Sequence, residues 1–205
     1  MTYTSVHNTR QTSELNDAVL RANTYTLLAR LLRATPDADL LELLSHIETA
    51  AEHGRGLGLS WHLLKLSASH ARPAALDDEY HALFIGLGHG EVIPYGSWYQ
   101  TGYLMDTPLA RLRYDLAQLG IERRDEVSEP EDHAAALCEA MAILIDKGTS
   151  LHVQQQFFRT HLHGWLARCF ADIEQAPSAH FYKAVGKLGQ HFIELEVRYL
   201  DVLDA

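Results

Sequence analysis

The sequence predicts an all-α protein, a single-domain bundle of eight or nine helices with one long loop rich in glycine and aromatic residues. Apolar residues recur every three or four positions along most of the 205 residues, which is the period of an amphipathic helix. The stretch that most resembles a strand, residues 91–94, is too short to build a sheet. We therefore expect one domain, residues 1–205, without β-structure.

Four helices are expected before residue 86. A stripe of apolar side chains defines the first: Leu15, Val19, Ala22, Tyr25, Ala29 and Leu32. Thr35 is expected to cap the second helix, with Pro36 in its first position. Ser60 is expected to cap a short third helix, and residues 75–84 have the pattern of the fourth.

Residues 86–102 differ from the rest, because five glycines and one proline stand among aromatic residues. This composition predicts a loop rather than a helix. Its aromatic side chains either pack the two halves of the chain together or anchor a bound peptide. Both roles are compatible if the loop lines a groove between helices.

Four further helices are expected after this loop. Thr107-Pro108 begins one that Gly120 ends, and a charged loop follows at residues 121–127. This segment, 121–128, is a candidate hinge between an N-terminal and a C-terminal half. Ser128 and Glu131 match the S-x-x-E capping box, which predicts a helix start. The last two helices are expected over residues 150–171 and after Pro177.

The charge balance narrows the class of partner. Seventeen basic and 27 acidic residues give a formal net charge of −10. Nucleic acids and anionic membranes require a positive face, so general binding to either is not expected. The balance suits a soluble protein with a cationic partner.

The compartment is predicted from the cysteines and the termini. Cys138 and Cys169 lie in apolar helical patterns and are expected to be buried free thiols, as in a reducing cytoplasm. The N-terminal segment lacks the apolar stretch of a signal peptide, and no run is long enough for a transmembrane helix. We therefore expect a cytoplasmic protein.

No catalytic residue is predicted. The sequence has no H-E-x-x-H motif, no P-loop and no G-x-S-x-G motif. Asp132, His133, His161 and His163 have no spacing that is diagnostic of a metal site, so no metal is expected. A small metal- or nucleotide-dependent hydrolase remains the alternative from another functional class.

An acidic cluster stands where the helix after the charged loop is expected to begin. Glu129, Glu131 and Asp132 precede His133 there. Such carboxylates either satisfy free N–H groups and the helix dipole, or form an exposed surface that attracts a basic, partly apolar peptide.

Three motifs taken together resemble the TorD/DmsD family of redox-enzyme maturation chaperones. They are Tyr80-x-x-Leu83-Phe84-x-Gly86, Pro94-Tyr95-x-Ser97-x-Tyr99 and Glu129-Pro130-Glu131-Asp132-His133. Each motif alone is weak, but the pairing of the first two with the third is specific. The resemblance covers roughly residues 20–200.

The resemblance implies a TorD-like helical fold and a cytoplasmic chaperone that is not an enzyme. Its partner would be a molybdenum-cofactor oxidoreductase of the DMSO- or TMAO-reductase type, bound through its twin-arginine signal peptide, its apo form or both. The chaperone would assist cofactor insertion and prevent premature Tat export. A client without a signal peptide is the third possibility.

The family further implies weak GTP binding in some members, no other cofactor, and either a monomer or a domain-swapped homodimer. The family motifs place client contacts on the residues that match them. Asp132 and His133 would touch the signal peptide, and Glu129, Pro130 and Glu131 would shape the turn. The remaining contacts would come from the aromatic loop and the segment before it: Leu83, Phe84, Pro94, Tyr95, Ser97 and Tyr99. Many relatives have two prolines and a tryptophan where this chain has Ile93-Pro94-Tyr95.

A twin-arginine signal combines two arginines with an apolar run, so its site requires carboxylates beside an apolar trough. Glu129, Glu131 and Asp132 next to Tyr95, Trp98 and Tyr99 would supply both. This interpretation requires the two loops to meet in space.

Overall fold

The computed structural model describes residues 6–49, 56–86 and 88–201. Within these ranges the chain forms ten α-helices and one π-helical turn, and its only β-type pairing is an isolated bridge between Tyr95 and His133. The prediction of an all-α protein is confirmed. The predicted number of eight or nine helices is too low, because α5 forms inside the expected loop and the single helix expected over residues 150–171 is divided in two.

The N-terminal helices are α1 (Val6–Arg33), α2 (Ala38–Ser45), α3 (Leu57–His70) and α4 (Pro73–Tyr80), which continues into the π-helical turn η2 (His81–Ile85). Two predicted caps are wrong. Asp37, not Thr35, caps α2 by accepting the Leu40 N–H at 2.8 Å. The N-cap of α3 is Gly56, so that Ser60 lies inside the helix.

The C-terminal helices are α5 (Gly96–Thr101), α6 (Thr107–Gln118), α7 (Ala134–Asp146), α8 (Leu151–His161), α9 (Leu166–Gln175) and α10 (Phe181–Asp201). The short helix α5 lies inside the segment that was expected to be a loop. Helix α6 ends near Gly120 and α10 follows Pro177, as predicted.

The single helix expected over residues 150–171 is instead two helices, α8 and α9. The break is at Trp165, whose indole N–H donates to the His161 carbonyl at 2.7 Å. In a continuous helix that carbonyl would accept the backbone N–H of residue 165. Here the Trp165 N–H turns to the Leu162 carbonyl at 3.2 Å, and the ring is buried.

Helix α7 begins later than the capping box predicts. Its N-cap is His133, whose Nδ1 accepts the Ala135 N–H at 3.1 Å. Ser128 and Glu131 lie outside the helix, and Glu131 pairs with arginines of other segments. The capping-box prediction is therefore wrong, because side chains distant in sequence bind the glutamate.

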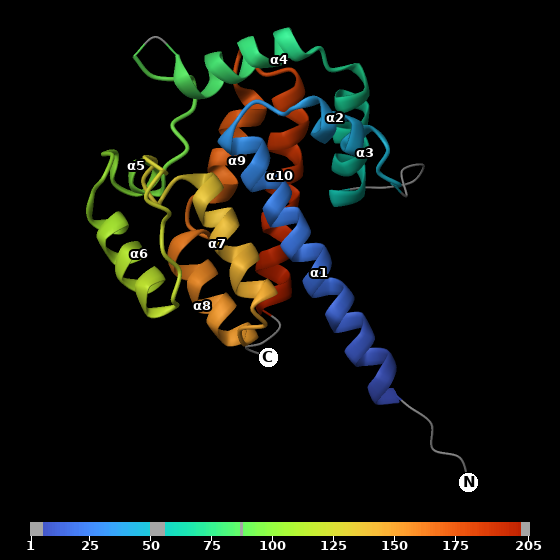
Figure 1. Cartoon of the computed structure of the whole chain (residues 1–205), viewed down its shortest axis with the longest axis vertical. Helices are drawn as coiled ribbons and strands as arrows, with labels where there is room; N and C mark the ends of the chain where they lie inside the picture. The colour runs from blue at the N-terminus through green and yellow to red at the C-terminus, as the bar shows by residue number, and fades with distance from the viewer. Residues whose placement is uncertain (1–5, 50–55, 87, 202–205) are drawn as a thin grey trace.

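The core forms where α1 packs along α7 and where α10 packs against α9 and α3 (Figure 1). Helix α1 contributes Tyr25, Leu28 and Leu32, all fully buried, whereas Val19 from the predicted stripe is 55% exposed. Both cysteines are buried and free, as predicted. Burial raises the pKa of Cys169 to about 12 and the pKa of Cys138 further, so both are neutral thiols.

A buried polar network joins α1 to α10 and α8. The Arg21 guanidinium donates to both oxygens of Glu196, at 2.6 and 2.9 Å, and to Gln154 at 3.0 Å. The Tyr25 hydroxyl donates to Glu196 at 3.0 Å, and burial followed by the Glu196 charge raises its pKa. These donors supply hydrogen bonds to the carboxylate of Glu196, which is 0% exposed.

None of the helices in the described ranges is long and apolar enough to cross a membrane.

Candidate functional site

The two loops that the sequence analysis expected to meet do lie against each other. The Gly96 N–H donates to the Asp132 carbonyl at 2.8 Å, and the Ala134 N–H donates to the Pro94 carbonyl at 2.8 Å. These bonds join the segment before α5 to the segment before α7. We call this contact the loop junction and define it as residues 94–97 together with 129–134.

Asp132 holds the loop junction from inside. Its side chain is buried, and Oδ2 accepts the backbone N–H of Ser97 at 2.8 Å. Ser97 is buried as well, and its Oγ accepts the Met105 N–H at 3.1 Å. The expectation of an exposed carboxylate at Asp132 is therefore wrong, because the aspartate caps the first turn of α5. Its second oxygen, Oδ1, is buried and has no hydrogen-bond partner in the described chain.

His133 is a neutral packing residue. Its ring lies edge-on to Tyr95 with centroids 5.0 Å apart. Burial lowers its pKa to about 4, although the charges of Glu129 and Asp132 act in the opposite direction. At neutral pH the imidazole is uncharged and free to accept the Ala135 N–H that begins α7.

The three carboxylates of the acidic cluster have three different environments. Glu131 binds two arginines, with Oε2 2.9 Å from Arg113 Nε and Oε1 3.4 Å from Arg123 Nε. Glu129 is exposed and accepts the Tyr95 hydroxyl. Burial, followed by this hydrogen bond, raises the pKa of Tyr95. Glu129 is thus the carboxylate of the cluster that faces solvent.

The aromatic residues of α5 lie beside a hollow that has both polar and apolar walls. Trp98 is 40% exposed. Tyr99 stacks on Trp165 with centroids 5.4 Å apart, and its hydroxyl donates to Asp172 at 2.6 Å. The side chains of Glu91, Trp98, Tyr99 and Asp172 line a hollow of about 400 Å³. Sequence analysis missed Glu91 and Asp172, because no local pattern connects either of them to the loop.

Three further predicted contacts are mainly core residues. Leu83 is fully buried, and Phe84 packs on Tyr80 and Tyr182 with ring centroids 5.1 and 5.3 Å away. Pro94 is also buried. A Cβ at Gly90 would lie 2.3 Å from the Leu83 carbonyl oxygen, so glycine is required where the aromatic loop crosses η2. These residues position the loop rather than face solvent.

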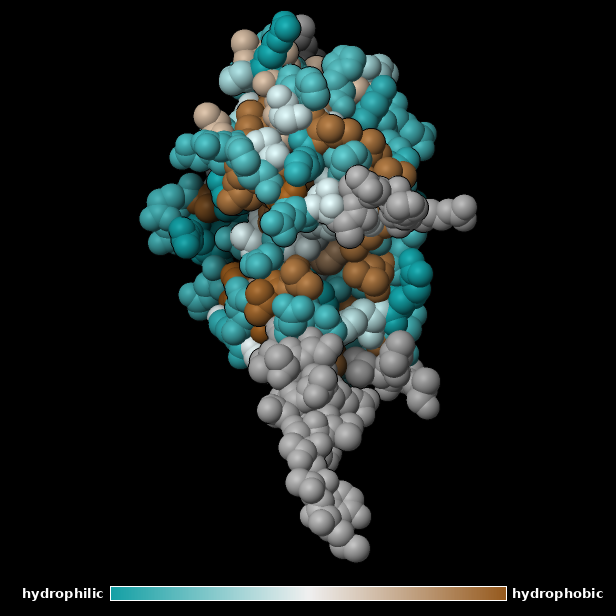
Figure 2. Space-filling model, turned by 90° about the vertical axis from the view of Figure 1, so that its right-hand side faces the viewer, coloured by the Kyte–Doolittle hydropathy of each residue, from teal (hydrophilic) through white to brown (hydrophobic). Residues whose placement is uncertain are grey.

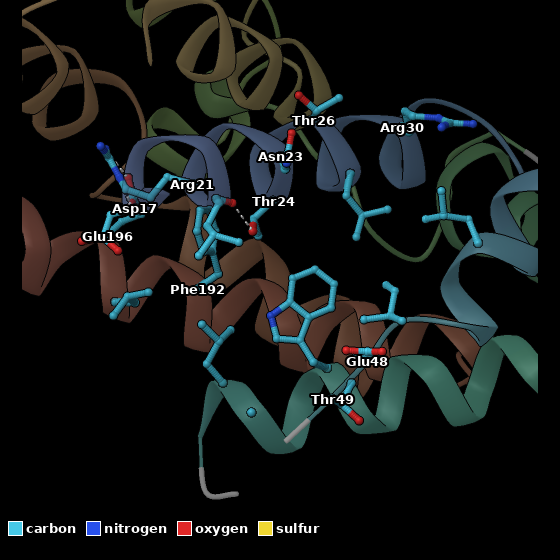
Figure 3. Close-up of a pocket in the computed structure, with 18 of the residues that line it drawn as sticks. Asp17, Arg21, Asn23, Thr24, Thr26, Arg30, Glu48, Thr49, Phe192 and Glu196 are labelled. Carbon is cyan, nitrogen blue, oxygen red and sulfur yellow. Dashed lines mark hydrogen bonds and ion pairs between the residues drawn. The ribbon is translucent and has the colours of Figure 1, made fainter. Parts of the chain in front are cut away.

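A larger groove lies on another face, between α1, α2, α3 and α10. Its volume is about 880 Å³, and most of its lining is apolar. Figure 2 shows hydrophobic surface gathered on this face, and Figure 3 shows the groove with α1 on one side and α3 on the other. Sequence analysis missed it, although Leu20 and Leu27, off the predicted core stripe of α1, were a signal for a second apolar face.

In the described ranges no three His, Cys, Asp or Glu side chains converge in a way that could hold a metal ion. His161 instead contacts Asp115, with Nε2 and Oδ2 2.8 Å apart. Weak GTP binding, the one cofactor that the resemblance implied, stays a prediction.

The structure is that of an all-α protein whose two motif loops are joined by backbone hydrogen bonds. Comparison with known proteins identifies its family. A family model described as the nitrate reductase delta subunit matches residues 50–171. The chain belongs to this family, whose TorD-like members are redox-enzyme maturation proteins.

Similarity to individual proteins supports this family assignment. The chain is 27% identical over 136 residues to the chaperone protein TorD of Actinobacillus pleuropneumoniae serotype 3, covering 66% of this chain and 68% of the relative. It is 33% identical over 120 residues to the Tat proofreading chaperone DmsD of Salmonella typhi, covering 57% of each. Similarity to TorD of Shewanella loihica extends over 86% of this chain, at 26% identity, and 77% of the relative.

A solved structure shares the fold. It is a protein from Archaeoglobus fulgidus described as a redox enzyme maturation protein, with a TM-score of 0.58 and 18% identity. The match covers 95% of this chain and 98% of that chain.

Proposed function

We propose that this protein is a cytoplasmic chaperone that binds the twin-arginine signal peptide of a molybdenum-cofactor oxidoreductase precursor. It would hold the precursor while the cofactor is inserted and so prevent premature Tat export. Family membership supports this proposal, as do relatives that are named TorD chaperones and a Tat proofreading chaperone. The observation that carries it is the loop junction, which joins the family's two motif loops.

The surface of the loop junction has the chemistry that a peptide arginine requires. Glu129 offers an exposed carboxylate beside Tyr95, and Trp98 presents part of its ring to solvent. A guanidinium pairs with carboxylates and stacks on aromatic faces. The net charge of −10 also favours the approach of a cationic peptide.

The buried members of the loop junction have a positioning role in this proposal. Asp132 fixes the start of α5 and so places Trp98 and Tyr99, which lie on that helix. His133 packs on the Tyr95 ring and caps α7. Substitution of either residue would disturb the surface without removing a direct contact to the peptide.

Isothermal titration calorimetry with twin-arginine signal peptides tests the proposal. We expect one peptide to bind, more weakly as salt rises, and to lose affinity when its two arginines become glutamine. If every peptide fails to bind but an intact apo-enzyme is captured, the protein serves the client body, as an assembly chaperone for a client without a signal peptide would. Failure of both would overturn the chaperone proposal.

A pair of matched variants locates the peptide site. Glu129→Gln removes the exposed carboxylate beside Tyr95, whereas Glu126→Gln makes the same change in the preceding charged segment. We expect the first variant to weaken peptide binding several-fold and the second to leave it unchanged. Equal effects would show general charge attraction without a site at Glu129.

A further inference from the structure

Three consecutive apolar side chains stand open to solvent in the α5–α6 loop, residues 102–106. Tyr103 is 72% exposed, Leu104 49% and Met105 71%. Figure 1 shows this loop at the edge of the bundle, on the opposite side from α3. An exposed run of three apolar residues is unfavourable in water and is typical of a surface that binds a partner. The α5–α6 loop is therefore a candidate contact surface.

The backbone of this loop holds Met105 in a strained conformation. Its φ is 58°, and the other described residues with positive φ are glycines. A side chain at positive φ crowds its own backbone, so glycine or asparagine would be more stable there. The core does not compensate for this strain, because Met105 is 71% exposed. The chain thus keeps a strained methionine that contributes little to its own packing, and strain of this kind is typical of ligand contacts.

Hydrogen bonds connect the α5–α6 loop to the loop junction. The Met105 N–H donates to Ser97 Oγ at 3.1 Å, and the Ser97 N–H donates to Asp132 Oδ2 at 2.8 Å. Ser97 and Asp132 are both buried. On the other side of Met105, Asp106 caps α6 by accepting the Thr107 N–H at 2.6 Å. The three apolar side chains are therefore held on a loop that directly contacts the loop junction.

We propose that the α5–α6 loop binds the apolar run of a twin-arginine signal peptide while the loop junction binds its arginines. This inference rests on the proposed function and adds a second subsite to it. The arginine pair and the apolar run are adjacent in the peptide, as the two surfaces are adjacent in the fold.

The side chains of the loop suit this occupant. Tyr103, Leu104 and Met105 carry no charge, so burying them against an uncharged apolar segment is favourable. The apolar run of a signal peptide is defined by its composition rather than by an exact sequence. Methionine is unbranched and polarisable, and it adapts to apolar side chains of different shapes.

Calorimetry with two peptides tests the proposal. One is a complete twin-arginine signal peptide, and the other keeps the arginine pair but has serine at each position of the apolar run. We expect the wild type to bind the complete peptide about tenfold more tightly, or more. The double variant L104Q/M105N should bind the complete peptide as weakly as the wild type binds the serine peptide. Its affinity for the serine peptide should equal that of the wild type, because the arginine contacts are unchanged.

Two single variants separate binding from stability. Leu66→Gln is the matched control, because Leu66 is 43% exposed on α3, on the other side of the bundle. It should leave the affinity for both peptides unchanged. Met105→Asn should not lower the melting temperature, because asparagine adopts positive φ more readily than methionine. The same variant should bind the complete peptide several-fold more weakly, which a merely structural role of Met105 does not predict.

The outcomes distinguish this inference from the proposed function. If the complete peptide binds, loses affinity in Glu129→Gln and is bound equally well by L104Q/M105N, the proposed function stands and this inference is wrong. If no signal peptide binds the wild type, both are overturned.

The same double variant tests the other possible occupants of the loop. Loss of apo-enzyme capture in L104Q/M105N, with unchanged affinity for the peptide, would overturn the inference and assign the loop to the client body. Altered self-association in sedimentation equilibrium, again with unchanged peptide affinity, would overturn it and assign the loop to a second copy.

Discussion

The loop junction and the α1 groove belong to one bundle but are built in opposite ways. At the loop junction, backbone hydrogen bonds and the buried carboxylate of Asp132 hold a few side chains in place. At the groove, apolar side chains such as Leu20 and Leu43 stay exposed, and their burial would release free energy only when a partner covers them. The first region is organised before binding, whereas the second needs a partner to be complete.

The largest expected effect is on the buried ion pair beside the groove. Glu196→Gln leaves the Arg21 guanidinium buried without its counter-charge, so we expect a loss of about 3–5 kcal/mol in the free energy of unfolding. Urea unfolding followed by circular dichroism measures it. The double variant R21M/E196L should recover much of the loss, because no unpaired charge remains. If Glu196→Gln unfolds at the wild-type urea concentration, the pair does not hold α1 on α10.

The next largest expected effect on the free energy of unfolding distinguishes the buried face of α1 from its exposed face. Leu28 is fully buried, so Leu28→Ala should cost about 2–5 kcal/mol in unfolding free energy. Leu20 is more than half exposed, so Leu20→Ala should change the monomer by less than about 0.5 kcal/mol. Chemical unfolding of both variants at low protein concentration makes the comparison. Similar losses would mean that α1 has no free apolar face.

A smaller effect is expected at the loop junction. Asp132→Ala leaves the buried Ser97 N–H without an acceptor, which should cost about 1–3 kcal/mol in unfolding free energy. Asp132→Asn keeps an oxygen acceptor and should lose less. Peptide affinity of the folded variant should fall only through misplacement of α5. Unchanged stability in Asp132→Ala would remove the capping role from this residue.

The smallest effect is on the pH dependence of stability. The pKa of His133 is lowered in the fold to about 4, from about 6.5 in an unfolded chain. Between these values the unfolded state binds a proton that the folded state does not, so stability falls as pH drops from about 6.5 to 4.

For one group the slope is at most about 1.4 kcal/mol per pH unit. His133→Asn keeps an N-cap acceptor and should flatten part of this loss in thermal unfolding at several pH values. The remainder includes His161, whose pKa burial also lowers. An identical pH profile in His133→Asn would contradict the assignment.

Local patterns predicted much of the fold. Helix α6 begins at Thr107 and α10 follows Pro177 as their sequences indicate, because proline and apolar period act within a few residues. The predictions that failed depend on contacts of individual side chains that a periodic pattern does not specify. The capping box failed where Arg113 and Arg123 bind Glu131, and the helix over 150–171 breaks where the Trp165 indole binds a backbone carbonyl.

At the candidate site, too, short motifs indicated part of the structure and tertiary packing decided the rest. The interpretation of the motifs required two loops about 35 residues apart in sequence to meet, and the hydrogen bonds between these loops show that they do. They could not predict that Asp132 is buried while Glu129 is exposed, because burial depends on how α5 packs against the start of α7. The roles of these residues in client binding stay predictions.

The sequence by itself determined the all-α class and the family, because helical period and short motifs are properties of neighbouring residues. Only the tertiary structure decided which carboxylates face solvent, where Trp165 interrupts a helix and that α1 carries a second, uncovered apolar face. Those features depend on which surfaces remain after distant helices have packed, and helical periodicity alone does not specify that packing.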